Sequence, residues 1–498
     1  MSRYLLGIDA GSSLTKAAIF DRAGNEVASA RERIALDRPR PGWCEIDPEA
    51  AWAAMCRAVR ATLARAGADG SDLAAVGLSA AMVGAWLVDA EGRALRPGII
   101  WEDSRTQAML DARVAADPDF FRRIFAADGC VMQQGCTLPL LAWLQANEPQ
   151  TLERAAFCFS YKDYLRMRLT GRAAADRTEA AVAPGDARGR GRSAAMLSLF
   201  GLDAVAAKLP PVADSESLAG EVTAHAARHT GLRPGTPVAV GAGDVPANIT
   251  GAGALADGAA LAVLGTTCIV GVVADRPVFS PPNLGLLFTL PGTAWFRAMV
   301  NVAGTLNLDW AIRTILGEEA PDAACFSAAE ALAAAQPIGS GGVVFLPYLS
   351  ESGIIAPVVD PHARAGFVGL TPRHGRAAMM RAVYEGVALA IRDLAGNLPE
   401  MHGDLILTGG GARSGLWPQM IADALGRAIV VPAASEFGAR GAALLAGTAI
   451  GWYPDIRTAS LAVRRNERRY VPEPQCRAEW DGAFARFRGF SEKLVRSR

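Results

Sequence analysis

Two distant segments of the chain share one pattern, and this pair limits the fold more than any other feature. Residues 5–21 and 260–273 each contain an apolar run, a turn of glycine followed by two hydroxyl residues, and a second apolar run. Each pattern predicts two strands joined by a tight turn. Such turns expose backbone N–H groups and short hydroxyls, which bind phosphate oxygens. Two of them facing each other would hold a nucleotide between two lobes.

The turn residues are therefore the first candidates for phosphate binding. They are Gly11, Ser12 and Ser13 in the first turn and Gly265, Thr266 and Thr267 in the second. Only the first turn has an acidic residue, Asp9, just before it. Its carboxylate could position Mg²⁺ through water against nucleotide phosphates. The alternative is an aspartate that starts an ordinary hairpin, and the second matching turn favours the functional interpretation.

The length of the chain predicts two large domains. A single core rarely serves 498 residues, and 51% apolar residues can fill two cores. We place the domains at residues 1–248 and 249–498. The zero net charge argues against a nucleic-acid partner. The chain shows neither a leader sequence nor an apolar run of the ~18 residues that a membrane span needs. Its eight cysteines contain no Cys-x-x-Cys, which favours a reduced, cytoplasmic location.

Strand and helix patterns alternate in both halves, which indicates an α/β fold. In the first half, Asp47 and Pro48 begin a helix that Gly67 can end. The other predicted elements are strand 74–79, helix 163–171, strand 238–243, helix 376–394, strand 405–408, helix 415–425 and an amphipathic helix from residue 479 that packs on the second lobe. The loop at residues 184–192 is rich in glycine and arginine, and we predict a solvated surface turn there.

Asp244 is the candidate catalytic residue. It follows a predicted strand and stands between small neighbours, in Gly241-Ala242-Gly243-Asp244. A carboxylate in that setting could accept the proton of a substrate hydroxyl as its oxygen attacks phosphorus. The alternative is an aspartate that caps a helix after a strand, which is common.

Two further groups of residues are weaker candidates. The glycine run 409–411 with Ser414 lies between a strand and a helix, where backbone can approach a flat ligand or a phosphate. Strand alternation would put Trp101, Asp103 and Arg105 on one face, where they could bind a hydroxylated ligand. The alternative for the second group is a surface salt bridge beside a core tryptophan. The histidines give no metal-binding pattern, and His225 and His229 fit a solvated pair.

Short motifs occur along the chain in a definite order. They are residues 7–13, 41–48, 101–105, 162–171, 243–244, 264–267, 345–348, 384–386 and 409–419. Each is modestly specific alone, but in this order and spacing they resemble the FGGY family of carbohydrate kinases over nearly the whole chain. The resemblance implies an α/β fold of two ribonuclease-H-like (actin/hexokinase-type) domains, with ATP in the cleft between them and a sugar deep beside it.

The resemblance also assigns roles to residues. Asp244 matches the catalytic base, and Asp9 matches the acid near the Mg²⁺-bound nucleotide. The matching nucleotide-binding residues are Ser12, Ser13 and Lys16 in the first phosphate loop, Gly265, Thr266 and Thr267 in the second, and Gly410, Gly411 and Ser414 in the adenosine pocket. The family also makes a homodimer plausible.

The predicted sugar pocket departs from one branch of the family. Xylulose kinases carry a Gln-Met-His run where this chain has Ala81-Met82-Val83. Loss of the Gln and His removes groups that would bind sugar hydroxyls, which argues against D-xylulose. Residues 299–310 look more like the erythritol and L-xylulose kinase branches. We assign substrate contacts to Met82, Trp101, Asp103, Arg105 and Asp244.

The predicted function is ATP-dependent phosphorylation of a primary hydroxyl on a small sugar or polyol, with a pentulose, tetritol or pentitol favoured. Two other functions remain open on this fold, because a fold alone does not fix activity. One is a non-catalytic sugar or nucleotide sensor, although a sensor does not need the base. The other is an actin-like ATPase that cycles without a small substrate.

Overall fold

The structure is a computed structural model that describes residues 3–350, 353–360, 362–434, 436–464 and 467–496. Both predicted hairpins are present. The first consists of β1 (Tyr4–Ala10) and β2 (Leu14–Phe20), and the second of β14 (Ala259–Leu264) and β15 (Cys268–Ala274). Both pairs are antiparallel. The sequence pattern therefore predicted the two hairpin turns in the correct place.

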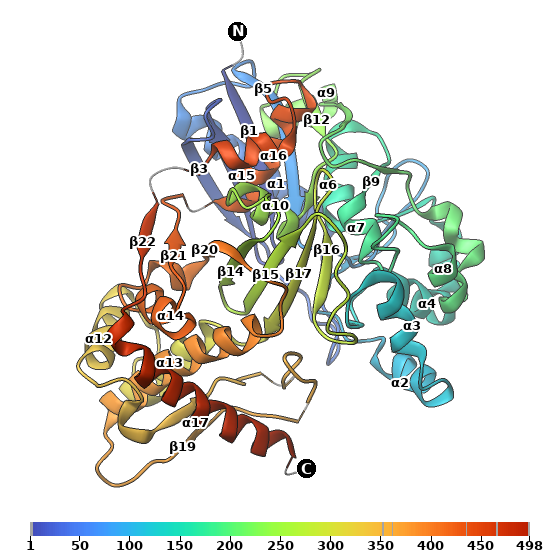
Figure 1. Ribbon diagram of the computed structural model, residues 1–498. Coiled ribbons are helices and arrows are strands. Elements are labelled where there is room, and N and C mark those ends of the chain that lie inside the picture. The colour runs from blue at the N-terminus through green and yellow to red at the C-terminus, as the bar shows by residue number, and fades with distance from the viewer. Residues whose placement is uncertain (1–2, 351–352, 361, 435, 465–466, 497–498) are drawn as a thin grey trace.

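Each hairpin belongs to its own seven-stranded sheet, and the two sheets share one local arrangement (Figure 1). In the first, β5 (Leu73–Ala80) pairs parallel with β1, and in the second, β20 (His402–Thr408) pairs parallel with β14. The other strands of the first sheet are β3 (Glu26–Arg33), β11 (Leu218–Glu221), β12 (Pro237–Ala239) and β13 (Ala242–Gly243). Those of the second are β16 (Leu286–Thr289), β17 (Trp295–Asn301), β21 (Ile429–Val431) and β22 (Arg468–Tyr470).

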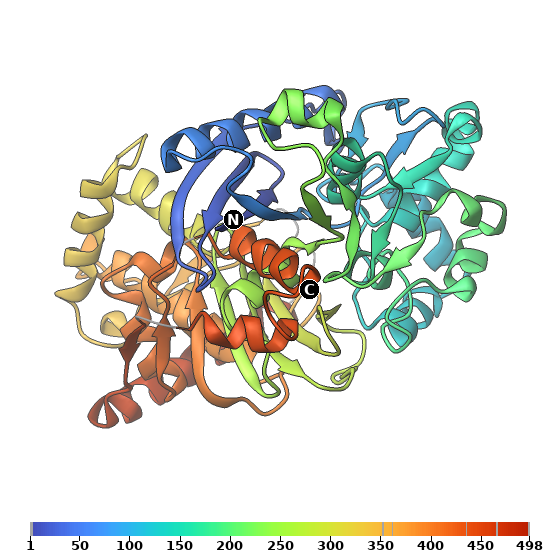
Figure 2. The ribbon, with the colours of Figure 1, turned by 90° about the horizontal axis from the view of Figure 1, so that it is seen from above.

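The helix α15 (Phe437–Ala449) follows the second hairpin in sequence but packs on β1 and β5 of the first sheet. Figure 2 shows it beside the N-terminal strands. Glycines permit the contact, because a Cβ on Gly7 would lie 1.7 Å from the Ala439 carbonyl oxygen and one on Gly77 would lie 1.8 Å from that of Ala442. The same helix crosses α10 (Asp244–Gly251) at Gly441. The two halves of the chain are thus packed together around one pair of helices.

The predicted helices are present. They are α1 (Pro48–Ala66), α6 (Tyr161–Thr170), α13 (Arg376–Ala395), α14 (Trp417–Leu425) and α17 (Arg477–Arg496). Asp47 caps α1 by accepting from the Ala50 amide, and Gly67 ends it. The α14 helix begins at Trp417 rather than at residue 415. Strand 238–243 is interrupted at Gly241, whose φ of 81° is left-handed, so it forms β12 and β13.

The remaining helices and two-stranded ladders complete the two halves of the chain. The helices are α2 (Gln107–Ala116), α3 (Phe120–Asp128), α4 (Thr137–Asn147), α5 (Pro149–Arg154), α7 (Arg177–Ala181), α8 (Ala194–Phe200), α9 (Ala224–Thr230), α11 (Leu306–Ala311), α12 (Ala323–Ala334) and α16 (Ile456–Ala462). The two-stranded ladders are β4–β7 (Glu45–Ile46, Gly98–Ile99), β6–β8 (Trp86–Val88, Phe157–Phe159), β9–β10 (Ala175–Asp176, Val212–Ala213) and β18–β19 (Val344–Leu346, Gly366–Val368). The boundary at residues 248/249 stays a prediction.

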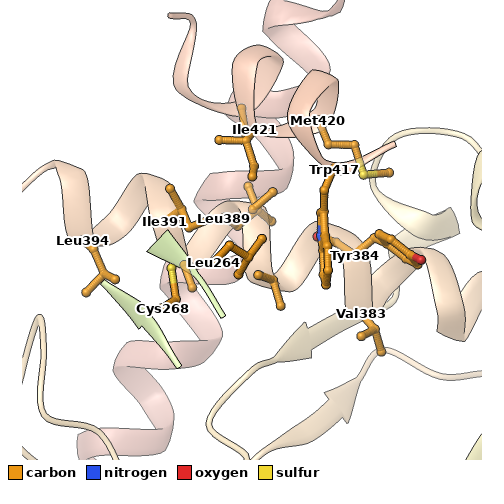
Figure 3. Close-up of a cluster of buried hydrophobic side chains, with 14 of the residues drawn as sticks. Leu264, Cys268, Val383, Tyr384, Leu389, Ile391, Leu394, Trp417, Met420 and Ile421 are labelled. Atoms are coloured by element: carbon orange, nitrogen blue, oxygen red, sulfur yellow. The ribbon is translucent and has the colours of Figure 1, made fainter. Parts of the chain in front are cut away.

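A cluster of buried side chains includes the two residues that flank the second turn (Figure 3). Leu264 and Cys268, which flank the turn, are fully buried in a cluster with residues of α13 and α14. Burial of side chains of this size contributes about 1.5–3 kcal/mol each. The apolar residues on both sides of the turn therefore keep its backbone at the edge of the sheet. No helix of the described residues combines the length and hydropathy needed to cross a membrane.

The prediction of a solvated turn at residues 184–192 is wrong. Arg190 donates to the carbonyl oxygens of Leu290 and Ala294, at 2.7 and 3.0 Å, in the turn between β16 and β17. The Arg188 guanidinium lies 3.9 Å from the centroid of the Phe279 ring. The arginines thus bind carbonyl and aromatic groups of the other half of the chain, and the loop joins the halves instead of extending into solvent.

Candidate active site

The register of the first sheet places Asp9 at the end of β1, beside Ser79 of β5 and opposite Lys16 of β2. Ser79 Oγ donates to Asp9 Oδ1 at 2.8 Å. Burial raises the pKa of Asp9, and the positive charge of Lys16 opposes that shift. A Cβ on Gly438, near the start of α15, would lie 2.6 Å from Asp9 Oδ2. The carboxylate is therefore held at the point where α15 meets the first sheet.

Asp244 lies near the same end of the sheet. Ala242 of β13 pairs with Ser79 of β5, which also pairs with Asp9, so Asp244 follows two residues past the level of Asp9. Burial, followed by the negative charge of Asp9, raises the pKa of Asp244 to about 7. Asp244 is the first residue of α10 rather than its cap, and Oδ1 accepts only from the adjacent Val245 amide, at 2.8 Å, among the hydrogen bonds of the described residues. The helix-cap alternative is therefore wrong.

The second phosphate turn is braced by the segment that follows β17. The Gly304 amide donates to the Thr266 carbonyl oxygen at 2.6 Å, and the Thr305 amide donates to that of Gly265 at 2.7 Å. Thr266 and Thr267 are exposed. The backbone of the turn is thus fixed while both threonines face the surroundings, which is what a phosphate-binding turn needs.

The glycine run lies beside the second turn, because β20 and β14 are parallel neighbours that end together. Gly410 is exposed and a Cβ on it would meet nothing within 4 Å, whereas Gly411 packs on the Leu264 side chain. Ser414 Oγ accepts from the amides of Leu416 and Trp417, at 3.1 and 3.0 Å. Ser414 thus orders the start of α14, and its hydroxyl proton is left to donate to a ligand.

The expectation for Trp101, Asp103 and Arg105 is wrong in its geometry. Residues 101–106 form turns rather than an extended strand, so alternation does not apply. Asp103 and Arg105 are buried and form a bidentate ion pair, with Nε to Oδ1 at 2.9 Å and Nη2 to Oδ2 at 2.8 Å. Asp103 also accepts from the Cys44 amide at 2.7 Å. Asp103 and Arg105 thus form a salt bridge, but the surface-salt-bridge alternative is also wrong in its placement, because the pair is buried and the tryptophan is exposed.

Trp101 alone of these three faces the candidate site. Trp101 is 44% exposed, and its indole N–H donates to Ser12 Oγ at 3.0 Å. A residue of the predicted sugar pocket thus touches the first phosphate turn. An exposed aromatic ring held in this way can pack against the apolar face of a sugar.

Met82 is the other predicted pocket residue near the acid. It is buried, and a Cβ on Gly243 would lie 2.4 Å from its Cγ, so Met82 packs on the residue that precedes Asp244. Met82 and Val83 share an apolar cluster with Cys136 and Val182. This side of the site therefore offers apolar surface where a Gln and a His would offer hydrogen bonds.

Some residues of the site were not predicted from the sequence. Glu436 precedes α15, is buried, and forms ion pairs with Lys16, at 3.6 Å, and with Arg31. Thr178 and Glu179 of α7 bond to the backbone beside Asp244 and Met82. The glycines and alanines of residues 438–443, which flank Arg440, are a signal for close helix packing, but the sequence pattern gives none for Thr178, Glu179 or Glu436.

The residues around Asp9 suit Mg²⁺ rather than a tightly caged metal. Mg²⁺ keeps several waters and is bound through one or two carboxylates together with substrate phosphates. Asp9 supplies such a carboxylate beside a phosphate turn. In the described part of the chain, no group of three or more His, Cys, Asp or Glu residues could hold a metal ion by itself. The rings of His225 and His229 lie 4.8 Å apart and form no such site.

Comparison with protein families gives two matches that together span most of the chain. Residues 4–251 match the N-terminal domain, and residues 260–450 the C-terminal domain, of the FGGY family of carbohydrate kinases. The chain is 32% identical to the xylulose kinase of Escherichia coli (strain K12), over 98% of this chain and 99% of that protein. It is 31% identical to the erythritol kinase of Brucella abortus (strain 2308), over 90% of this chain and 88% of that protein.

Solved structures agree. A xyloylose kinase from Brucella ovis superposes with a TM-score of 0.87 at 32% identity and covers 99% of both chains. A ligand-bound xylulose kinase from Lactobacillus acidophilus has a TM-score of 0.90 at 24% identity, again over 99% of both chains. These matches confirm the predicted two-domain α/β fold of actin/hexokinase type. Neither the sensor nor the actin-like ATPase finds support among the relatives.

Proposed function

Since this chain belongs to the FGGY family of carbohydrate kinases, and is therefore a sugar or polyol phosphotransferase that uses ATP with Mg²⁺, we propose that it phosphorylates a primary hydroxyl with Asp244 as the base. The raised pKa of Asp244 is the observation that most strongly supports its role as the base. Burial and the charge of Asp9 raise the pKa of Asp244 to about 7. A carboxylate with such a pKa accepts a proton effectively at neutral pH.

In the proposed step, Asp244 takes the proton from the substrate hydroxyl. The oxygen attacks the γ-phosphorus of ATP, a new oxygen–phosphorus bond forms, and the bond to the β-phosphate oxygen breaks to release ADP. The transferred group carries negative charge throughout. We assign Asp244 to hold the attacking oxygen in line, because it directly follows β13, two residues past the level of Asp9.

The two turns would bind the triphosphate. We assign this role to the turns at residues 11–13 and 265–267, through the N–H and hydroxyl groups of their Ser and Thr residues, together with Lys16. The amides of Gly11 and Gly265 donate within their own turns, to the carbonyl oxygens of Leu14 and Thr267. We place the adenosine at Gly410, Gly411 and Ser414. Donors fixed before the reaction stabilise developing charge without reorganising. Asp9 would hold Mg²⁺ through water, and the ion would neutralise phosphate charge when bound.

The substrate that fits best is a small pentulose, tetritol or pentitol. We place it between Asp244 and Trp101, with Met82 on one side. Asp103 and Arg105 are bonded to each other, so their contribution is to hold the loop that presents Trp101. Relatives named erythritol kinase and probable L-xylulose kinase support this size class. A homodimer and a cytoplasmic location stay predictions.

An ATP-consumption screen tests the proposal. Tetritols, pentitols, pentuloses, hexuloses and glycerol are compared for ADP release by the full chain. We expect one compound of the four- or five-carbon classes to give strong turnover and Asp244→Asn to lower kcat by ~10²-fold or more. Asp393→Asn is the matched control, because Asp393 is a buried carboxylate that pairs with Arg488 outside the site. Near-wild-type turnover of Asp244→Asn would refute the assignment of the base.

A further inference from the structure

The short helix α7 joins two segments of the candidate site that are far apart in sequence. Thr178 Oγ1 accepts from the Gly243 amide at 2.9 Å, and Glu179 Oε2 accepts from the Val83 amide at 2.9 Å. Gly243 directly precedes Asp244, and Val83 directly follows Met82. Two consecutive side chains thus hold the backbone beside the proposed base and beside the proposed pocket.

The hydrogen bond from the Gly243 amide to Thr178 holds a short strand that follows an irregular backbone position. Strand β13 comprises only Ala242–Gly243, and it follows Gly241, which has a left-handed φ of 81°. Asp244 does not cap α10, so its side chain does not fix the start of that helix. The Thr178 hydroxyl is therefore the side-chain contact that fixes the amide next to Asp244.

The bond to Val83 holds a strained residue. Val83 has a φ of 58°, which β-branched residues rarely adopt. Such conformations persist where surrounding contacts determine them, and they cluster at functional sites. Glu179 supplies one such contact, and the Gly84 amide supplies another by donating to the Gly135 carbonyl oxygen at 3.1 Å. The backbone at Val83 is thus fixed from both sides.

Buried charges anchor α7. Thr178 Oγ1 donates to Asp176, and Asp176 forms an ion pair with Lys162 at 2.8 Å, with both of these charged side chains fully buried. Glu179 is itself buried, and among the described residues its Oε1 has no hydrogen-bond partner. Burial, followed by the negative charge of Asp176, raises the pKa of Glu179 well above its usual range. Gln is therefore a close mimic of the neutral Glu179.

We propose that Thr178 and Glu179 are positioning residues, with Thr178 setting the place of Asp244 and Glu179 setting the pocket backbone at Met82 and Val83. This inference rests on the proposed function of the same site. Neither side chain has to touch the substrate. The proposal gives them separate consequences, because Thr178 acts on the base and Glu179 acts on the pocket.

Paired variants of the full chain test the proposal. Thr178→Val removes the acceptor for Gly243 at similar size, and Thr178→Ser keeps it. Glu179→Leu removes the acceptor for Val83, and Glu179→Gln keeps it. We expect Thr178→Val to lower kcat by about 10- to 100-fold, the scale of a misplaced reacting group, with the KM for ATP unchanged. We expect Glu179→Leu to raise the KM for the sugar about tenfold, the scale of about 1.4 kcal/mol. Thr178→Ser and Glu179→Gln should restore most of each parameter.

Amide hydrogen exchange gives a second readout that does not need turnover. We expect faster exchange at Gly243 in Thr178→Val and at Val83 in Glu179→Leu, each relative to its conservative partner. Variants that lose thermal stability but keep wild-type kcat, KM and exchange at these amides would overturn the proposal. If the wild-type chain shows no sugar-dependent turnover, the proposed function fails. The positioning roles are overturned separately if exchange at Gly243 is unchanged in Thr178→Val and exchange at Val83 is unchanged in Glu179→Leu.

Discussion

At the scale of single residues, the site depends on two partly buried carboxylates that interact. The charge of Asp9 adds to burial in raising the pKa of Asp244 to about 7. Because the base works only when ionised, kcat/KM, which reports the free enzyme, should rise with pH through a midpoint near 7 and fall below it. Asp9→Asn removes one negative charge, so the midpoint should move to lower pH. A pH–rate profile of both proteins measures this shift, and an unchanged midpoint would contradict the coupling.

The same raised pKa affects stability. Asp244 has a higher pKa in the folded state than in the unfolded state. Its contribution to stability is therefore complete only below the unfolded pKa, about 3.8, and it is lost as the pH rises to about 7. The loss is about 1.4 kcal/mol per pKa unit. Asp244→Asn cannot ionise, so it should raise the Tm, and more at pH 8 than at pH 5. Thermal unfolding at the two pH values checks this, and a uniformly lower Tm would contradict it.

Individual residues differed in how far the sequence could place them. The position of Asp9 follows directly from the strand and turn pattern, because a residue near a strand end before a glycine turn has little freedom. Asp244 was placed after a strand, but the interruption of that strand at Gly241 was not predicted. Asp103 and Arg105 could not be placed in this way. Their side chains pair with each other only because residues 101–106 turn back, and that turn depends on contacts with Cys44 and Glu45.

At the scale of elements, the crossing of α10 and α15 depends on glycine. A Cβ on Gly441 would lie 1.9 Å from the Ala247 carbonyl oxygen, which is backbone and cannot rotate away. Gly441→Ala should therefore lower the free energy of unfolding by about 1–3 kcal/mol or more. Gly489→Ala is the control, because Gly489 is exposed in α17 and a Cβ there meets nothing within 4 Å.

In that control, alanine should be neutral or should stabilise by up to about 1 kcal/mol, the difference in helix propensity. Denaturant unfolding of the two variants provides the comparison. Equal stability of Gly441→Ala and the wild type would mean that the helices do not cross as closely as described.

Elements with strong local signals were predicted well, and those fixed by distant partners were not. Hairpins and capped helices such as α1 were correctly placed because caps and periodicity are local. The loop at residues 184–192 was predicted wrongly from its glycine and arginine content. Its Arg190 binds carbonyls about a hundred residues away, and composition carries no record of such a partner.

At the scale of the whole molecule, the two halves are less separate than the duplicated hairpins suggest. Helix α15 comes from the second half of the chain but covers β1 and β5, and Glu436 before it pairs with Lys16 of the first phosphate turn. The sequence predicted two lobes because it contains two hairpins. It could not predict that a helix of one half packs on the sheet of the other, because that contact depends on glycines in three separate segments.

The central claim is that one turn from each half binds the same triphosphate and directs it to Asp244. The most direct measurement is a crystal structure of the chain with Mg²⁺, a non-hydrolysable ATP analogue and the preferred sugar. We expect the phosphates between residues 11–13 and 265–267, with the sugar hydroxyl between Asp244 and the γ-phosphorus. A triphosphate bound elsewhere, or a sugar hydroxyl out of reach of Asp244 in the closed complex, would contradict the claim.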